Sequence, residues 1–211
     1  MSLADIRREY AGEPLTEAHA DSDPMRQFVK WFEQARVAEP DPTAMALATA
    51  SAQGRPSVRT VLLKGVDERG FVFYTNYESR KAREMEATGR ASLLFFWRSL
   101  DRQVRVDGTV ERVSAAESDA YFETRPLESR LSVYASRQSD AIDCRDVLED
   151  AFERARRAYG DGSVPRPAWW GGYRVIADEF EFWQGRESRL HDRLRYTHQR
   201  DGSWRRERLA P

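Results

Sequence analysis

The thirteen residues from position 181 to position 193 gather side chains that can bind an anion or an electron-rich ring. They include three arginines, one histidine and one tryptophan. If the second half of this segment is an extended strand, alternate side chains share a face, so Arg189, His191 and Arg193 project together. The spacing therefore predicts a cationic and aromatic surface suited to a bound anion or a flat conjugated ring.

A second cationic group stands at a predicted helix start. Ser79 can cap the helix, and Arg80 and Lys81 follow it in the first turn, where the helix dipole favours carboxylates. A bound anion would resolve this conflict, because free backbone N–H groups and two cations together can hold a phosphate. The alternative from the residues alone is a solvated basic helix face.

Arg59 and Lys64 flank a short apolar run in another predicted strand. Because they are five positions apart, a regular strand would direct them to opposite faces. A shared cleft would require a bulge, a strand end or a second subunit. Taken alone, each side chain is interpreted as a surface cation.

A phenol, a guanidinium and a hydroxyl recur at intervals of four in Tyr121, Arg125 and Ser129. On a continuous helix these groups would align and could bind a phosphate monoester. Pro126 interrupts such a helix. The alternative is that Tyr121 and Phe122 anchor a helix to the core while Arg125 is exposed.

Composition and missing motifs exclude several classes of function. The 34 basic and 35 acidic residues nearly cancel, which argues against a nucleic-acid partner. The single cysteine, Cys144, excludes an internal disulfide, and the three histidines lack metal-ligand spacing. No dinucleotide-binding loop, Walker loop or hydrolase nucleophile elbow is present. Apolar runs are too short to cross a membrane and the N-terminus lacks a signal peptide's apolar stretch, so we expect a cytoplasmic protein without a membrane partner.

The periodicity predicts an α+β fold that is mainly antiparallel β. Residues 1–21 form a polar arm that we expect to be mobile, and residues 22–211 form one domain. One helix begins after the cap at Asp23, and besides the helix at Ser79 a capping box at Ser114 opens another helix that ends near Pro126. A further helix runs over residues 141–159, and Asp201-Gly202 marks a final hairpin. The predicted strands are 44–50, 57–64, 71–75, 92–97, 103–113, 173–183 and 189–196, and their number favours a closed or partly closed barrel.

Two phosphate-suited clusters beside a Trp/Arg/His surface suit a phosphorylated cofactor next to a phosphorylated substrate. The motifs of the chain resemble those of the pyridoxine/pyridoxamine 5′-phosphate oxidase family, and the resemblance covers nearly its whole length. The matching motifs are Ile6-Arg7-Arg8-Glu9-Tyr10, Asp41-Pro42-Thr43-Ala44-Met45, residues 59–64, Phe73-Tyr74-Thr75-Asn76, Ser79-Arg80-Lys81-Ala82, Arg102-Gln103-Val104, Arg137-Gln138-Ser139, Trp170-Gly171-Gly172, residues 181–193 and Arg208-Leu209-Ala210-Pro211.

This resemblance implies an FMN-binding split β-barrel with peripheral helices, working as a homodimer whose C-terminal region carries the dimerisation and signature segment. Arg189 and His191 become the expected catalytic residues. The implied FMN-binding positions are Arg59, Thr60, Val61, Leu62, Leu63, Lys64, Tyr74, Thr75, Arg80, Lys81, Gln103, Gln138, Ser139, Trp183 and Arg193. The implied substrate-binding positions are Arg7, Arg8, Tyr10, Lys64, Tyr121, Arg125, Ser129, Arg189, Leu190 and His191, of which the first three belong to a closing arm.

The implied reaction converts pyridoxamine 5′-phosphate and pyridoxine 5′-phosphate to pyridoxal 5′-phosphate. Dioxygen is the electron acceptor, hydrogen peroxide is released, and the amine substrate also yields ammonia. One alternative is a phenazine-type oxidase of the same fold, and another is a non-catalytic carrier of flavin or pyridoxal phosphate. Residues 130–134 depart from the family's usual sequence, which affects the expected preference between the amine and the alcohol.

Overall fold

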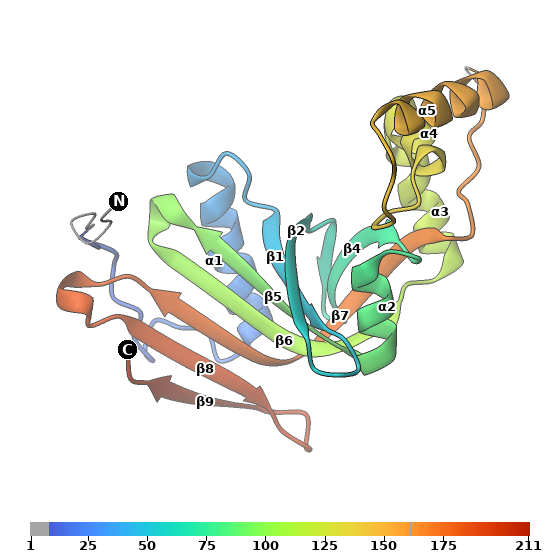
Figure 1. Cartoon of the computed structure of the whole chain (residues 1–211). Coiled ribbons are helices and arrows are strands. Elements are labelled where there is room, and N and C mark those ends of the chain that lie inside the picture. The colour runs from blue at the N-terminus through green and yellow to red at the C-terminus, as the bar shows by residue number, and fades with distance from the viewer. Residues whose placement is uncertain (1–8, 161) are drawn as a thin grey trace.

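The computed structural model describes residues 9–160 and 162–211, and within them the chain forms one curled antiparallel sheet with helices at its periphery (Figure 1). Strands follow the order β2-β1-β5-β6-β7-β4-β3, and β8 and β9 extend the sheet from β7. Their bounds are β1 Ala44–Ala50, β2 Pro56–Leu62, β3 Gly65–Asp67, β4 Gly70–Asn76, β5 Arg90–Trp97, β6 Arg102–Arg112, β7 Trp170–Gln184, β8 Asp192–His198 and β9 Trp204–Leu209.

The long strand β7 splits the sheet. Its first half pairs with β4 over residues 170–175, and its second half pairs with β8 over residues 179–184. Both halves pair with β6 on the other side, and the register shifts between Asp107 and Gly108. A Cβ at position 108 would lie 2.1 Å from the carbonyl oxygen of Ile176, so only glycine fits the close approach of the two strands there. The register shift lies where β7, which pairs with β6 throughout, changes its other partner from β4 to β8. This change of partner divides the sheet in two, as the predicted split barrel requires.

Five α-helices occur among the described residues, and local sequence explains where several of them begin. Helix α1 starts after Asp23, whose side chain accepts from two backbone N–H groups, and α3 starts with the predicted capping box of Ser114 and Glu117. Their bounds are α1 Pro24–Ala38, α2 Arg80–Thr88, α3 Ala115–Thr124, α4 Leu127–Ala135 and α5 Asp146–Tyr159. None of the helices in the described part is long and apolar enough for a membrane span.

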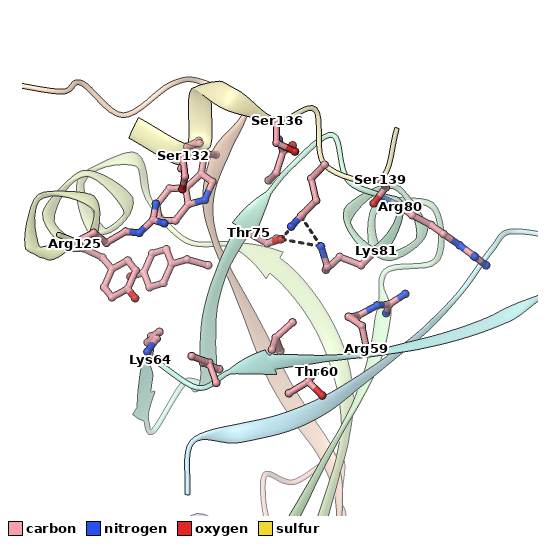
Figure 2. A pocket seen from close by; sticks show the side chains of 18 of the residues that line it. Arg59, Thr60, Lys64, Thr75, Arg80, Lys81, Arg125, Ser132, Ser136 and Ser139 are labelled. Atoms are coloured by element: carbon pink, nitrogen blue, oxygen red, sulfur yellow. Dashed lines mark hydrogen bonds between the residues drawn. The ribbon is translucent and has the colours of Figure 1, made fainter. Parts of the chain in front are cut away.

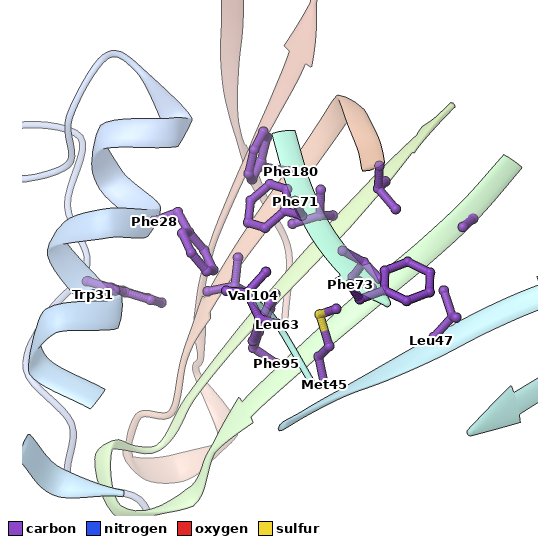
Figure 3. Packing of buried hydrophobic residues seen from close by; sticks show 14 of the residues in the cluster. Phe28, Trp31, Met45, Leu47, Leu63, Phe71, Phe73, Phe95, Val104 and Phe180 are labelled. Carbon is purple, nitrogen blue, oxygen red and sulfur yellow. The ribbon is translucent and has the colours of Figure 1, made fainter. Parts of the chain in front are cut away.

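The core lies between α1 and the concave side of the sheet (Figure 3). Phe28 of α1 is fully buried and meets Phe71 edge-on with ring centroids 4.8 Å apart, and Phe95 at 5.0 Å. Trp31, one turn later, packs edge-on against Phe182 of β7. Helices α3, α4 and α5 gather at the far end of the sheet around a smaller apolar cluster (Figure 1).

Two predicted strands have wrong bounds, and one helix was not predicted. The strand expected over residues 189–196 begins at Asp192, and Arg189 lies in a short 3-10 turn with φ of 62°. The helix expected to end near Pro126 does so, but α4 follows directly and was not predicted. The strand expected over residues 57–64 ends at Leu62, because the backbone N–H of Lys64 pairs with Val72 of β4 instead.

Residues 9–21 lie along the C-terminal hairpin of β8 and β9. The backbone N–H of Leu15 donates to Asp192, Arg208 donates to Glu17, and the hydroxyl of Tyr196 donates to the carbonyl oxygen of Asp21. The mobility of this arm stays a prediction, and Arg7 and Arg8 lie outside the described residues.

Candidate active site

A cavity of about 680 Å³ opens between β2, β4, the start of α2 and the turn between α3 and α4. It brings together most of the predicted cofactor and substrate positions (Figure 2). The predicted residues that line it are Arg59, Thr60, Val61, Leu62, Lys64, Tyr74, Thr75, Arg80, Lys81, Tyr121, Arg125, Gln138 and Ser139.

At one end of this cavity, Lys81 is nearly buried. Its ammonium donates to Gln138 Oε1 at 2.7 Å and to the hydroxyls of Thr75 and Ser79, each at 3.1 Å. Burial and the nearby charge of Arg59 lower the pKa of Lys81 to about 8. The three acceptors are uncharged, so the ammonium retains a net positive charge that an anion can neutralise.

The first turn of α2 supplies further donors at the same end. Ser79 caps the helix, as predicted, and the backbone N–H of Arg80 donates to the hydroxyl of Ser139 at 3.1 Å. The side chains of Arg80 and Arg59 approach the carboxylate of Glu84 at 2.7 Å and 3.5 Å. This end of the cavity therefore combines three cations, a helix N-terminus and polar side chains, which together suit a phosphate.

The other end of the cavity is aromatic and cationic. Tyr121 stacks on Tyr74 with ring centroids 3.8 Å apart, and Trp170 lies parallel to Tyr74 at 5.6 Å. The guanidinium of Arg125 lies 4.6 Å from the centroid of the Trp170 ring, and its buried Nη1 has no hydrogen-bond partner among the described residues. Burial lowers the pKa of Arg125, as expected for a desolvated cation that lacks an anionic partner. A ligand anion would supply that partner.

Arg59 and Lys64, which would face opposite sides of a regular strand, reach the same cavity because β2 ends between them. The N–H of Leu63 bonds to Thr43 beside β1, whereas the N–H of Lys64 bonds to Val72 of β4, so the chain crosses from one part of the sheet to the other between them. Both cations then line the same cavity, on opposite sides in Figure 2.

The signature segment lies elsewhere in the same chain. Gln103, Trp183 and Arg193 line a separate cavity of about 300 Å³, and Arg193 donates to Glu181 at 2.7 Å. His191 lies beside Trp183 with ring centroids 4.7 Å apart. The residues proposed for catalysis are therefore not at the 680 Å³ cavity of their own chain.

His191 sits between aromatic rings and a backbone donor. Tyr10 packs edge-on against both His191 and Trp183, and the N–H of Arg186 donates to Nδ1 of His191 at 3.1 Å. Burial and the charge of Arg189 lower the pKa of His191, which favours the neutral ring with its proton on Nε2. Arg189 and Leu190 are exposed.

Besides Tyr10, Gln103 and the residues of the signature segment, two further predicted positions in the described part of the chain lie away from the wall of the 680 Å³ cavity. Leu63 is buried in the core, so only its backbone could contact a ligand, and Ser129 does not line the cavity. The structure adds eight residues that sequence reasoning missed. Of these, Glu84 could have been found from its spacing of four after Arg80 on a helix, and Trp170 from its motif. The eight residues are Glu84, which contacts Arg80 from behind the cavity wall, and the lining residues Ser57, Val58, Asn76, Ser132, Val133, Ser136 and Trp170.

Comparison with known families gives matches over most of the chain. A model described as pyridoxamine 5′-phosphate oxidase matches residues 32–159, and one described as the pyridoxine 5′-phosphate oxidase C-terminal dimerisation region matches residues 170–211. A pyridoxine/pyridoxamine 5′-phosphate oxidase of Rubrobacter xylanophilus is 58% identical over 99% of this chain and 96% of its own length. One from Bordetella pertussis is 54% identical over the full length of both chains.

Solved structures agree with the sheet architecture. PhzG from Burkholderia lata, solved in complex with tetrahydrophenazine-1-carboxylic acid, is 33% identical and aligns with a TM-score of 0.88 over 95% of this chain and 99% of its own. A pyridoxamine 5′-phosphate oxidase-related, FMN-binding protein of Nostoc punctiforme aligns with a TM-score of 0.72 over 90% of this chain and 100% of its own, at 16% identity, and supports the fold. The chain therefore belongs to the pyridoxamine 5′-phosphate oxidase family of oxidoreductases, as its motifs predicted.

Proposed function

We propose that this protein uses FMN to oxidise pyridoxamine 5′-phosphate and pyridoxine 5′-phosphate to pyridoxal 5′-phosphate. Dioxygen is reduced to hydrogen peroxide, and the amine substrate also releases ammonia. The observation that carries this proposal is one cavity with a cationic group at each end, Arg59, Arg80 and Lys81 at one and Lys64 and Arg125 at the other. Two phosphorylated ligands, a cofactor and a substrate, match this distribution of charge.

The residues of the first end fit the phosphate of FMN. The ammonium of the nearly buried Lys81 donates to the neutral oxygens of Thr75, Ser79 and Gln138, and the α2 N-terminus lies beside it. When bound, FMN supplies the acceptor for a hydride equivalent, which none of the protein's side chains can provide. In this proposal, Thr60, Val61 and Leu62 of the edge strand β2 contact the flavin along the cavity wall.

The second end fits the substrate phosphate. The unpartnered Nη1 of Arg125 would gain a charge-assisted hydrogen bond, and Tyr121 and Lys64 can each donate one more. Ser129 is a candidate by resemblance, and Ser132, which lines the cavity, is a candidate by position.

A homodimer would complete the site. We propose that Gln103, Trp183 and Arg193 of the second subunit close the cavity over the flavin, and that the second subunit's Arg189, Leu190 and His191 contact the substrate ring. The match of residues 170–211 to a dimerisation region supports this arrangement, as does the separation of the two groups within one chain. The arm with Tyr10, Arg7 and Arg8 would then cover the substrate.

The protein groups in this proposal bind and orient the substrate. In the dimer, the exposed guanidinium of Arg189 and the neutral ring of His191 would hold the pyridine ring with its reacting carbon toward the flavin. Cations at both cavity ends also stabilise negative charge that develops during the reaction.

The alternative of a phenazine-type oxidase has its own support, because PhzG shares the fold at 33% identity. Against it stands the combination of Lys64, Tyr121 and Arg125 around the second end of the cavity, which suits a phosphorylated substrate. A non-catalytic carrier would need these phosphate contacts as well, but it would have no use for Arg189 and His191.

The test is to mix FMN-loaded protein with pyridoxamine 5′-phosphate under air and to follow pyridoxal 5′-phosphate and peroxide together. Equal appearance of both products supports the proposal. A yellow protein that forms neither product would contradict it and favour one of the two alternatives.

The shared site has a separate test. Arg125→Ala and Arg189→Ala proteins, unfolded and refolded together, should regain about a quarter of wild-type activity at a substrate concentration well below the KM of Arg125→Ala, because half of the dimers would contain one intact site. Mixtures that stay inactive would contradict a site built from two subunits.

A further inference from the structure

Glu84 lies directly behind the cationic end of the cavity that contains Lys81. Its side chain is 7% exposed and accepts hydrogen bonds from β1, from β2 and from its own helix. Thr49 Oγ1 donates at 2.5 Å, Ser57 Oγ also donates, Arg80 Nε donates at 2.7 Å, and Arg59 Nη2 lies at 3.5 Å. One carboxylate thus contacts both arginines of this end.

These contacts define how the two guanidiniums are held. Arg59 is also fixed by the carbonyl oxygen of Leu47 at 2.9 Å and by Thr49 at 2.7 Å. Arg80 is contacted through Nε, which leaves the two terminal nitrogens of this guanidinium for a ligand. Because the Arg80 side chain is 56% exposed, the contact with Glu84 restricts a side chain that would otherwise sample many rotamers.

Glu84 is charged in this environment. Burial opposes ionisation, but the hydrogen bonds from Ser57, Thr49 and Arg80 outweigh it and lower the pKa of Glu84 to about 2. The carboxylate also offsets part of the repulsion among three neighbouring cations, Arg59, Arg80 and Lys81.

We propose that Glu84 is a positioning residue that holds Arg59 and Arg80 in the orientation that binds the phosphate of the flavin. This inference rests on the proposed use of FMN. Glu84 lies outside the cavity wall, yet it would contribute to the affinity and selectivity for a phosphorylated flavin. The reason is that an arginine already held in its binding orientation loses less conformational freedom when the ligand binds.

The experiment compares FMN with riboflavin, which lacks the phosphate, by quenching of flavin fluorescence. Glu84→Ala should raise the dissociation constant of FMN by about tenfold or more and change that of riboflavin by less than about twofold. Glu84→Gln should stay within about threefold of wild type for FMN. Its amide oxygen can accept from Arg80 while its NH₂ group donates to the hydroxyls of Thr49 and Ser57. Arg59 would lose its weak 3.5 Å contact with residue 84 but keep its bonds to Leu47 and Thr49.

Glu86→Gln is the matched control. Glu86 lies on the same helix and accepts from Tyr173 at 2.6 Å and from Arg112 at 2.9 Å, away from the phosphate end. This variant should bind both flavins as the wild type does. It controls for the loss of a carboxylate from α2.

Several outcomes would overturn the role of Glu84. Equal weakening of both flavins by Glu84→Ala would show a merely structural role, and tighter FMN binding would show that Glu84 acts as a repelling anion. Glu84→Gln binding FMN as weakly as Glu84→Ala would also contradict positioning by hydrogen bonds. A wild-type protein that binds FMN no better than riboflavin would instead contradict the phosphate site and the proposed function, so the two failures are distinguishable.

Discussion

The ammonium of Lys81 lies 2.7 Å from the Oε1 of Gln138, and this contact joins the first turn of α2 to a loop 57 residues later in the chain. It closes one end of the cavity and holds a nearly buried cation against neutral acceptors. Charge at this position, rather than a preformed ion pair, therefore controls how an anion binds there.

The affinity for FMN should depend on pH through Lys81. Its pKa is lowered to about 8 by burial and by Arg59, so the side chain is protonated below that pH and neutral above it. The doubly charged phosphate of FMN, which forms above a pKa of about 6, binds best to protonated Lys81. Affinity should therefore be highest between about pH 6 and pH 8, and above pH 8 it should fall by at most about tenfold per pH unit. Titration of flavin fluorescence across this range measures the effect. Lys81→Met should bind FMN more weakly and lose the decline near pH 8, and a decline that persists would assign it to another group.

Arg125→Ala should weaken binding of the phosphorylated substrate without loss of FMN. Removing a charge-assisted hydrogen bond costs roughly 1.5–3 kcal/mol, which corresponds to an increase in KM of about tenfold to a hundredfold. Steady-state kinetics with pyridoxamine 5′-phosphate gives the KM, and bound flavin is measured by absorbance. Arg36→Ala removes an exposed arginine of α1 and serves as the control. An unchanged KM would exclude Arg125 from the substrate site.

Arg189→Ala should keep bound FMN and lose most turnover. The side chain is exposed in its own chain and is proposed to position the substrate ring, where misplacement costs about a hundredfold in rate. The measurement is the rate at which pyridoxamine 5′-phosphate bleaches the flavin in the absence of oxygen. Arg205→Ala, an exposed arginine of β9 paired with Glu207, should bleach at the wild-type rate. Normal bleaching in Arg189→Ala would remove this residue from the mechanism.

Gly108→Ala should destabilise the fold at the point where the sheet splits. The added Cβ would meet the backbone oxygen of Ile176 at 2.1 Å, so β6 and β7 must move apart, at a cost of about 1–3 kcal/mol in the free energy of unfolding. Urea denaturation measures this change. Gly65→Ala is the matched control, because its Cβ would make an ordinary 3.5 Å contact with Val72. Equal stability of the two variants would show that the strands tolerate the extra group.

Local chemistry in the sequence predicted much of the fold. The cap at Asp23, the capping box at Ser114 and the turn at Asp201-Gly202 are confirmed, and β1 has the predicted bounds. These features depend on residues within one turn or one strand of each other, which is why spacing reveals them. The split barrel was predicted from the family motifs, because chains that share the same side-chain types at the same spacing share a fold, and the solved structures agree.

Tertiary structure decided how these elements form a site. The strand end between Leu63 and Lys64 depends on pairing with different partners, and the turn at Arg189 overrides the alternation that predicted an extended strand. The spacing of four links Glu84 to Arg80, but its contacts with Thr49 and Ser57 depend on β1, β2 and α2 lying side by side. Sequence spacing reports which side chains share a local face, whereas strand pairing and buried charge depend on segments far apart in the chain, so only the folded structure determines them.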